Sequence, residues 1–148
     1  MGTAPSACSA RDPASTVAGE LSPAGLMQVP LTIRSGGRTH RFVVEVARTP
    51  EQQATGMMNR QSVAPDRGML FPYSPPQPVA FWMKNTLIPL DMIFIGEDGR
   101  ISRIAENAVP MSLNVVPSVE PVVAVLELGG GRAAALGLKP GDRVEWPR

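Results

Sequence analysis

Proline and glycine interrupt this chain too often for it to be built from long helices. Its 148 residues include 16 prolines and 14 glycines, residue types that end helices and favour turns. The runs between them are short and rich in β-branched and aromatic residues, as is typical of strands. With 43% apolar residues the chain can form a hydrophobic core, and its length suits one domain. We therefore predict a mainly β fold.

Several of these runs predict particular strands. Val29–Ile33 alternates, Ser35-Gly36-Gly37 turns the chain, and residues 40–47 return, which indicates a hairpin. Because it contains three prolines, Ser74–Pro78 is expected to be a surface loop, and residues 107–121 are expected to be a long connection. Further strands are expected at residues 67–73, 79–83, 90–95, 101–105, 122–128 and 143–146.

Two short helices complete the expected fold. Thr49-Pro50-Glu51-Gln52 has the composition of a capped helix start, with Gln52 at the position of a capping-box partner. Residues 131–136 predict one or two turns of a second helix. The whole pattern indicates a single-domain sandwich or distorted barrel of about eight short strands with one or two short helices.

The first 28 residues form a separate segment in this interpretation. Residues 1–28 are rich in small residues and proline, which favours a disordered leader before a domain at 29–148. Ser6-Ala7-Cys8-Ser9 resembles the end of a bacterial lipoprotein signal, although no positive and apolar segments precede it. We therefore expect an exported, periplasmic protein whose signal has been trimmed, with a membrane tether at its N-terminus. Alternatively Cys8 is an incidental thiol. Met1-Gly2 also fits a loose myristoylation template.

The charge and the motifs exclude several classes. A net charge of +1 with dispersed basic residues gives no basis for nucleic-acid binding, and no apolar run approaches the ~18 residues of a spanning helix. Residues 129–134 imitate a dinucleotide fingerprint, but the chain ends before the required acidic residue. With one histidine and one cysteine, no nucleophilic triad or zinc site is predicted. We assign no catalytic residue, metal ligand or cofactor.

One stretch combines aromatic and polar residues unusually. Phe81–Asp91 holds Lys84, Asn85 and Asp91 within an apolar run, which predicts two strands joined at a polar corner. Cations and an amide can hold a small anion, so we hypothesise that an unknown small molecule or protein binds here. A buried salt-bridge network that fixes the corner is the alternative. The proposed ligand-binding residues are Arg60, Trp82, Lys84, Asn85, Asp91 and Glu127.

Three other functions stay open. Met57, Met69 and Met83 fall in one segment, and thioethers suit monovalent copper, although methionine also fills irregular cores. Lys84 with a lowered pKa could act as a base, but no partner nucleophile is evident, so an enzyme is disfavoured. In the third alternative, the motifs only maintain the fold, and residues 74–78 or 107–121 make the functional contacts.

Several motifs occur together in a fixed order. They are Gly56-Met57-Met58-Asn59-Arg60, Gly68-Met69-Leu70-Phe71, Phe81-Trp82-Met83-Lys84-Asn85-Thr86, Pro89-Leu90-Asp91, Leu126-Glu127-Leu128 and Gly141-Asp142. In these residues the chain resembles the domain-of-unknown-function family 192, departing from it at Asn59, where an apolar residue is common. The resemblance implies a mainly β, jelly-roll-like fold and frequent export. It implies no reaction, substrate or catalytic residue.

Overall fold

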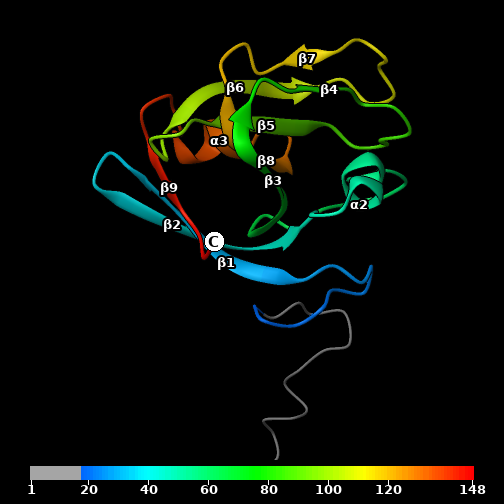
Figure 1. Cartoon of the computed structure of the whole chain (residues 1–148), viewed down its shortest axis with the longest axis horizontal. Helices are drawn as coiled ribbons and strands as arrows, with labels where there is room; N and C mark the ends of the chain where they lie inside the picture. Colours follow the sequence, from blue (N-terminus) through cyan, green and yellow to red (C-terminus); the bar gives the residue numbers. More distant parts are fainter. Residues whose placement is uncertain (1–17) are drawn as a thin grey trace, which may run out of the picture.

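The computed structural model describes residues 18–148, so the leader with Cys8 lies largely outside the described part. The mainly β class predicted from the sequence is confirmed, with nine strands and two short helices in the described part (Figure 1). These elements are β1 (Gln28–Ser35), β2 (Arg38–Val46), α2 (Pro50–Thr55), β3 (Arg67–Gln77), β4 (Ala80–Phe81), β5 (Leu90–Ile95), β6 (Ile101–Ala108), β7 (Val116–Pro117), β8 (Val122–Gly129), α3 (Arg132–Leu136) and β9 (Arg143–Glu145).

Seven strands form one curved mixed sheet in the order β6-β5-β8-β3-β2-β1-β9. The predicted hairpin is present as β1 and β2, which pair antiparallel from Gln28↔Glu45 to Ser35↔Arg38. Strand β3 lies parallel to β2, and α2 lies in the crossover between them, as a parallel pair requires. Strand β8 lies between β5 and β3, in agreement with its nearly continuous apolar sequence.

The sheet curls but does not close into a barrel. Its end strands are β6 and β9, and an isolated bridge between Arg100 and Arg143 ties them at one corner. The expected strand-corner-strand unit is divided between two sheets, because β4 pairs with β7 whereas β5 joins the main sheet. In Figure 1 β7 lies above β5 and β6, while α2 lies at one side of the sheet.

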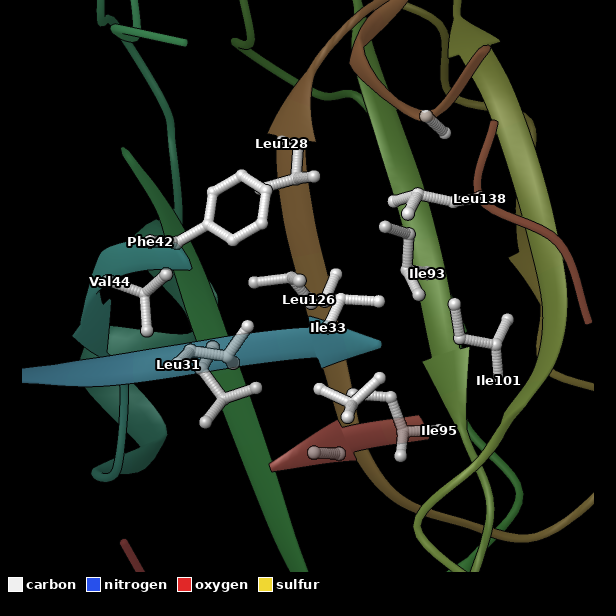
Figure 2. Close-up of a cluster of buried hydrophobic side chains, with 14 residues drawn as sticks. Leu31, Ile33, Phe42, Val44, Ile93, Ile95, Ile101, Leu126, Leu128 and Leu138 are labelled. Atoms are coloured by element: carbon white, nitrogen blue, oxygen red, sulfur yellow. The ribbon is translucent and has the colours of Figure 1, made fainter. Parts of the chain in front are cut away.

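Side-chain alternation divides the core into two clusters. Leu70, Ile93, Leu126 and Leu128 belong to the first cluster, which lies inside the curl of the sheet together with side chains of β1, β2 and β9 (Figure 2). Their neighbours Met69, Met92 and Val125 belong to the second cluster, because successive strand residues point to opposite faces. Glu127 lies between Leu126 and Leu128, so its side chain points towards this second, methionine-rich cluster.

The predicted start of α2 is confirmed in detail. Thr49 Oγ1 accepts a hydrogen bond from the Gln52 backbone N–H, and Gln52 Oε1 accepts one from the Thr49 backbone N–H. This reciprocal pair is a capping box. The helix ends at Gly56, whose backbone has φ +47°. A helix of six residues is thus held by its cap and by its neighbours rather than by its own length.

Two expected connections contain strand structure. The prediction that residues 74–77 form a loop was wrong, because β3 continues to Gln77, which pairs with Val122. A shift of register between Pro72 and Gln77 allows prolines to lie there without ladder N–H donors. The connection expected from residue 107 also begins with the end of β6 and contains β7, which pairs with β4.

The segment before β1 packs onto the domain. We expected the domain to begin at residue 29, but the backbone N–H of Gly19 donates to the carbonyl of Gln28 at 2.8 Å, and Leu21 forms a bridge with Met27. Leu26 is buried in the second cluster. The structure therefore includes the last ten or so residues of the expected leader in the packed domain.

Candidate functional site

The corner at residues 83–86 is a tight turn on the surface. Lys84 and Asn85 are exposed, whereas Met83 and Thr86 are buried. Asn85 has φ +55°, a left-handed conformation in which asparagine is tolerated better than most residues. Thr86 Oγ1 donates to the carbonyl of Lys84 at 3.1 Å, and the Asn59 N–H donates to the carbonyl of Asn85 at 2.8 Å. Asn85 and Thr86 therefore stabilise the turn itself.

Asp91 lies near the start of β5 and organises the loops around α3 rather than the corner. Its carboxylate has no exposed surface and accepts hydrogen bonds from three backbone N–H groups, those of Asn107 (2.8 Å), Gly131 (3.1 Å) and Ala133 (2.8 Å). Two of these groups lie at the start of α3, where a negative charge is favourable. All of its contacts are therefore with the protein's own backbone.

Arg60 is bound to another acidic residue. Its guanidinium forms a two-point ion pair with Glu45, in which Nη2 donates to Oε2 at 3.1 Å. Ser22 Oγ also donates to Glu45 Oε2, at 2.6 Å. This group ties the segment before β1, strand β2 and the loop after α2 together, and it lines a cavity of about 570 Å³. This cavity thus contains charges that already neutralise each other.

We expect Arg60→Met to destabilise the fold by about 2–3 kcal/mol, because Glu45 would then be a buried charge without a cation. Urea unfolding at pH 7 measures the effect. The double variant Arg60→Met with Glu45→Gln is expected to recover part of the loss, since it removes the uncompensated charge. Equal losses in the single and double variants would contradict this explanation.

Glu127 occupies the floor of a different cavity. This cavity, of about 290 Å³, lies between α2, β3 and β4, and Glu127 enters it from the central strand β8. Only 4% of Glu127 is exposed. On the neighbouring strands it lies opposite Met69 and Met92, which offer no charge. Within residues 18–148 its carboxyl forms no hydrogen bond or ion pair.

Burial without a partner changes the acidity of this carboxyl. Removal from water disfavours the charged form and raises the pKa of Glu127 from 4.5 to about 8. Burial also raises the pKa of Tyr73, which lines the same cavity, to about 12, and the charge of Glu127 adds to this rise. At neutral pH both groups are therefore largely protonated.

Aromatic rings form part of the cavity wall. Phe71 and Phe81 meet edge to face with ring centroids 4.9 Å apart, and Tyr73 and Trp82 line the same space. Trp82 is 46% exposed, so it lies at the surface, and Lys84 Nζ is 5.3 Å from the centroid of its ring. The other lining residues are Gln53, Ala54, Thr55, Gly56, Met57, Met58 and Ala80.

The structure therefore separates the six predicted site residues. Glu127 and Trp82 line one cavity, with Lys84 beside Trp82 at its edge. Arg60 lines another cavity together with Glu45, and Asp91 is enclosed beside α3. Asn85 contacts the loop after α2 through its backbone. Only part of the set thus faces a common concave surface.

The sequence interpretation missed several residues of the Glu127 cavity. Tyr73, Phe71 and Phe81 were assigned to strands without a role. The alternation of Met69, Phe71 and Tyr73 places them on one face of a strand, but nothing in the sequence shows that this face meets Glu127. That contact depends on the pairing of β3 with β8, in which Met69 lies opposite Glu127. Gly68 allows this close pairing, because a Cβ there would lie 2.5 Å from the Glu127 carbonyl oxygen.

Among residues 18–148, no group of three or more His, Cys, Asp or Glu side chains is placed to hold a metal ion. In the same residues no helix is long and apolar enough to cross a membrane. The three methionines considered for copper are buried in the second cluster; they are Met57, Met69 and Met83. Their burial fits a packing role as well as a copper site.

Comparison with known proteins identifies the family. The model of DUF192, described as Uncharacterized ACR, COG1430, matches residues 31–146, which is most of the chain. This chain belongs to the DUF192 family. The match confirms the resemblance noted in the sequence, and it extends over every strand from β2 to β9. No functionally curated protein matches the chain.

Two solved structures resemble this DUF192 protein over most of its length. A protein of unknown function from Novosphingobium aromaticivorans DSM 12444 is 46% identical, with a TM-score of 0.85, and the match covers 92% of this chain and 98% of that one. A Sinorhizobium meliloti 1021 structure described as a "putative transcription regulator" is 44% identical, with a TM-score of 0.80, covering 89% and 98%. Neither description states a ligand or a reaction.

Proposed function

We propose that this DUF192 protein binds a small molecule in the Glu127 cavity. The observation that carries the proposal is a carboxyl on the central strand, 4% exposed and unpaired within the described residues, at the floor of an open cavity. A buried polar group without a partner destabilises the folded state. Binding of a ligand that supplies the partner would explain why such a group is present. Concave sites that combine aromatic side chains with a few polar groups are typical of ligand binding.

This proposal moves the site away from the corner at Lys84 and Asn85. The anionic ligand expected from the sequence depended on free cations, but Arg60 is paired with Glu45 and Asp91 is occupied by backbone N–H groups. Of the predicted residues, Glu127 and Trp82 are retained as ligand contacts. Lys84 is retained at the edge of the cavity, above Trp82.

The test is a fragment screen monitored by two-dimensional NMR of the ¹⁵N-labelled protein. We expect at least one chemical class to shift the amide signals of residues 53–58, 73 and 80–82, which line the cavity. Glu127→Leu fills the floor with an apolar group, and the same compounds should then bind at least tenfold more weakly. A screen in which no class shifts these signals would contradict the proposal.

Binding of monovalent copper is a second candidate for the same region. Met57 and Met58 line the cavity, and Met69 and Met92 flank Glu127 in the sheet. Thioether sulfur suits monovalent copper. Titration with monovalent copper under reducing conditions distinguishes the two candidates, since a copper site requires that Met57→Leu weaken binding, whereas a site for organic ligands does not.

The surface loop between β6 and β7 supports a third candidate, in which the protein acts through a partner. Val109, Met111, Leu113 and Val115 are large apolar residues that are more than half exposed. The loop also contacts the corner, since the Met83 N–H donates to the carbonyl of Ser112 at 3.0 Å. Replacing these four residues with serine would abolish such an interaction and leave ligand binding at Glu127 unchanged.

Catalysis by Lys84 and action on nucleic acid receive no such support. Within residues 18–148 the Lys84 amine has a contact with Trp82 but no hydrogen-bonded side chain that could act as a nucleophile. A net charge of +1 gives no reason to extend the transcription-regulator description to this protein.

Export to the periplasm stays a proposal that rests on residues 6–9, and fractionation of cells expressing the full-length gene tests it.

A further inference from the structure

We propose that the ligand of the Glu127 cavity is a small organic ammonium cation, held by the Glu127 carboxylate and by the aromatic rings around it. This inference rests on the proposed function and gives the ligand a chemical class. It depends on three features of the cavity: the unpaired acid, the rings, and the lack of a basic side chain among the lining residues.

The buried acids of this fold show what Glu127 lacks. Asp91 receives three backbone N–H donors, and Glu45 receives Arg60 and Ser22. Asp142 accepts the Lys139 N–H at 2.9 Å and its Nζ at 3.3 Å. Glu127 has no such donor within the described residues. A ligand that brings a positive charge would supply the missing partner, because buried charges are stable when they are paired.

The rings around Glu127 fit the same kind of ligand. Aromatic faces attract cations, and cages of several rings are used to bind quaternary and methylated ammonium groups. Four rings line this cavity, those of Phe71, Tyr73, Phe81 and Trp82. Trp82 already attracts one cation, the Lys84 amine at 5.3 Å. An anion would meet the Glu127 carboxylate without a basic side chain among the lining residues, so the chemistry disfavours it.

The size and the donor set favour an organic cation over a hard metal ion. A volume of about 290 Å³ accommodates a group such as trimethylammonium, whereas calcium or magnesium requires several oxygen ligands in contact with the ion. Glu127 supplies a single carboxylate, and no cluster of His, Cys, Asp or Glu is found among residues 18–148.

Binding of a cation should release a proton. Burial raises the pKa of Glu127 to about 8, so at pH 7 the acid is mostly protonated, and it must ionise to pair with the ligand. Affinity should then rise roughly tenfold from pH 6 to pH 7 and level off above pH 8. The other titratable group in the cavity, Tyr73 on β3, has a pKa raised to about 12 and stays neutral over this range.

The remaining elements around Glu127 bring no other charge that titrates there. Strand β5 presents Met92, and its Asp91 lies on the opposite face against α3. Helix α2 presents Gln53, while its Glu51 lines a neighbouring cavity. The chain after β4 presents Trp82, followed by Lys84 above it. The pH dependence between pH 6 and pH 8 is therefore assigned to Glu127.

The experiment compares choline with its uncharged isostere 3,3-dimethylbutan-1-ol, using NMR titration and calorimetry of the full chain. We expect choline, but not the alcohol, to shift the cavity amides, with release of nearly one proton at pH 7 measured in buffers of different ionisation enthalpy. Glu127→Gln should weaken choline binding at least tenfold and abolish proton release. Lys84→Met should strengthen choline binding a few-fold, because the substitution removes the amine that competes for the Trp82 ring.

The control Glu106→Gln, an exposed residue of β6, should bind choline as the unmodified protein does. Equal binding of choline and the alcohol at the cavity would overturn the cationic inference but leave the proposed binding site in place. Failure of both compounds, together with a fragment screen that leaves the cavity signals unchanged, would overturn both proposals. Binding of choline that is unaffected by Glu127→Gln would also contradict the inference.

Discussion

Glu127→Gln is expected to make the protein more stable at alkaline pH and to flatten its stability between pH 5 and pH 8. In the folded protein the pKa of this carboxyl is raised to about 8, from 4.5 in the unfolded chain. The folded state thus binds more protons than the unfolded state in this interval, and its stability falls as pH rises. The unfolding equilibrium constant should increase by roughly tenfold per pH unit there. Above pH 8 the loss levels off.

The size of the effect follows from the cost of an unpaired buried charge. Near pH 5 the variant and the unmodified protein should agree within about 1 kcal/mol, because both side chains are then neutral. At pH 9 the variant should be more stable by on the order of 4 kcal/mol, the sum of about three pH units of tenfold change. Urea unfolding at a series of pH values measures the difference, with Glu106→Gln as the exposed control. Parallel pH profiles for the variant and the unmodified protein would show that Glu127 is not the titrating group.

Asp91→Ala is expected to cost about 3–5 kcal/mol, a large share of the stability of a domain of this size. The substitution removes the acceptor of three backbone N–H groups, and buried donors left without partners are costly. It also removes the negative charge at the start of α3. In the variant, hydrogen exchange at the amides of Asn107, Gly131 and Ala133 should become faster by a larger factor than exchange at the amides in the core of β8.

The matched control is Asp98→Ala. Its Oδ1 accepts a single hydrogen bond from the Arg100 N–H in an exposed turn, so the loss should stay below about 1 kcal/mol. If Asp91→Ala cost no more than this control and the three amides stayed protected, Asp91 would not be the structural anchor of α3.

The parts of the fold that the sequence predicts well are those determined by local chemistry. The capping box at Thr49 and Gln52 and the apolar run of β8 both follow from neighbouring residues. Residues 74–77 were predicted wrongly because proline was taken to exclude a strand. A register shift in the pairing of β3 with β8 removes the need for those N–H groups, and such a shift has no local signature.

The candidate site was predicted only in part, for a related reason. Glu127 was noticed because a carboxyl interrupts an apolar strand, and Trp82 because it adjoins a polar corner. Asp91 has the same kind of sequence environment as Glu127, yet it meets three backbone donors. The two acids differ in which face of the sheet they occupy and in which loops cover them. These are properties of strand pairing and chain crossing, and the sequence pattern does not specify them.

The most direct test of the account is the titration of the Glu127 carboxyl itself, followed by ¹³C NMR and assigned with Glu127→Gln. In the free protein this carboxyl should titrate with a midpoint near pH 8, because it is buried and has no partner in the cavity. Saturating choline should lower that midpoint by more than one pH unit. A midpoint near 4.5, unchanged by choline, would mean that the carboxyl is already solvated or paired, and would contradict the account.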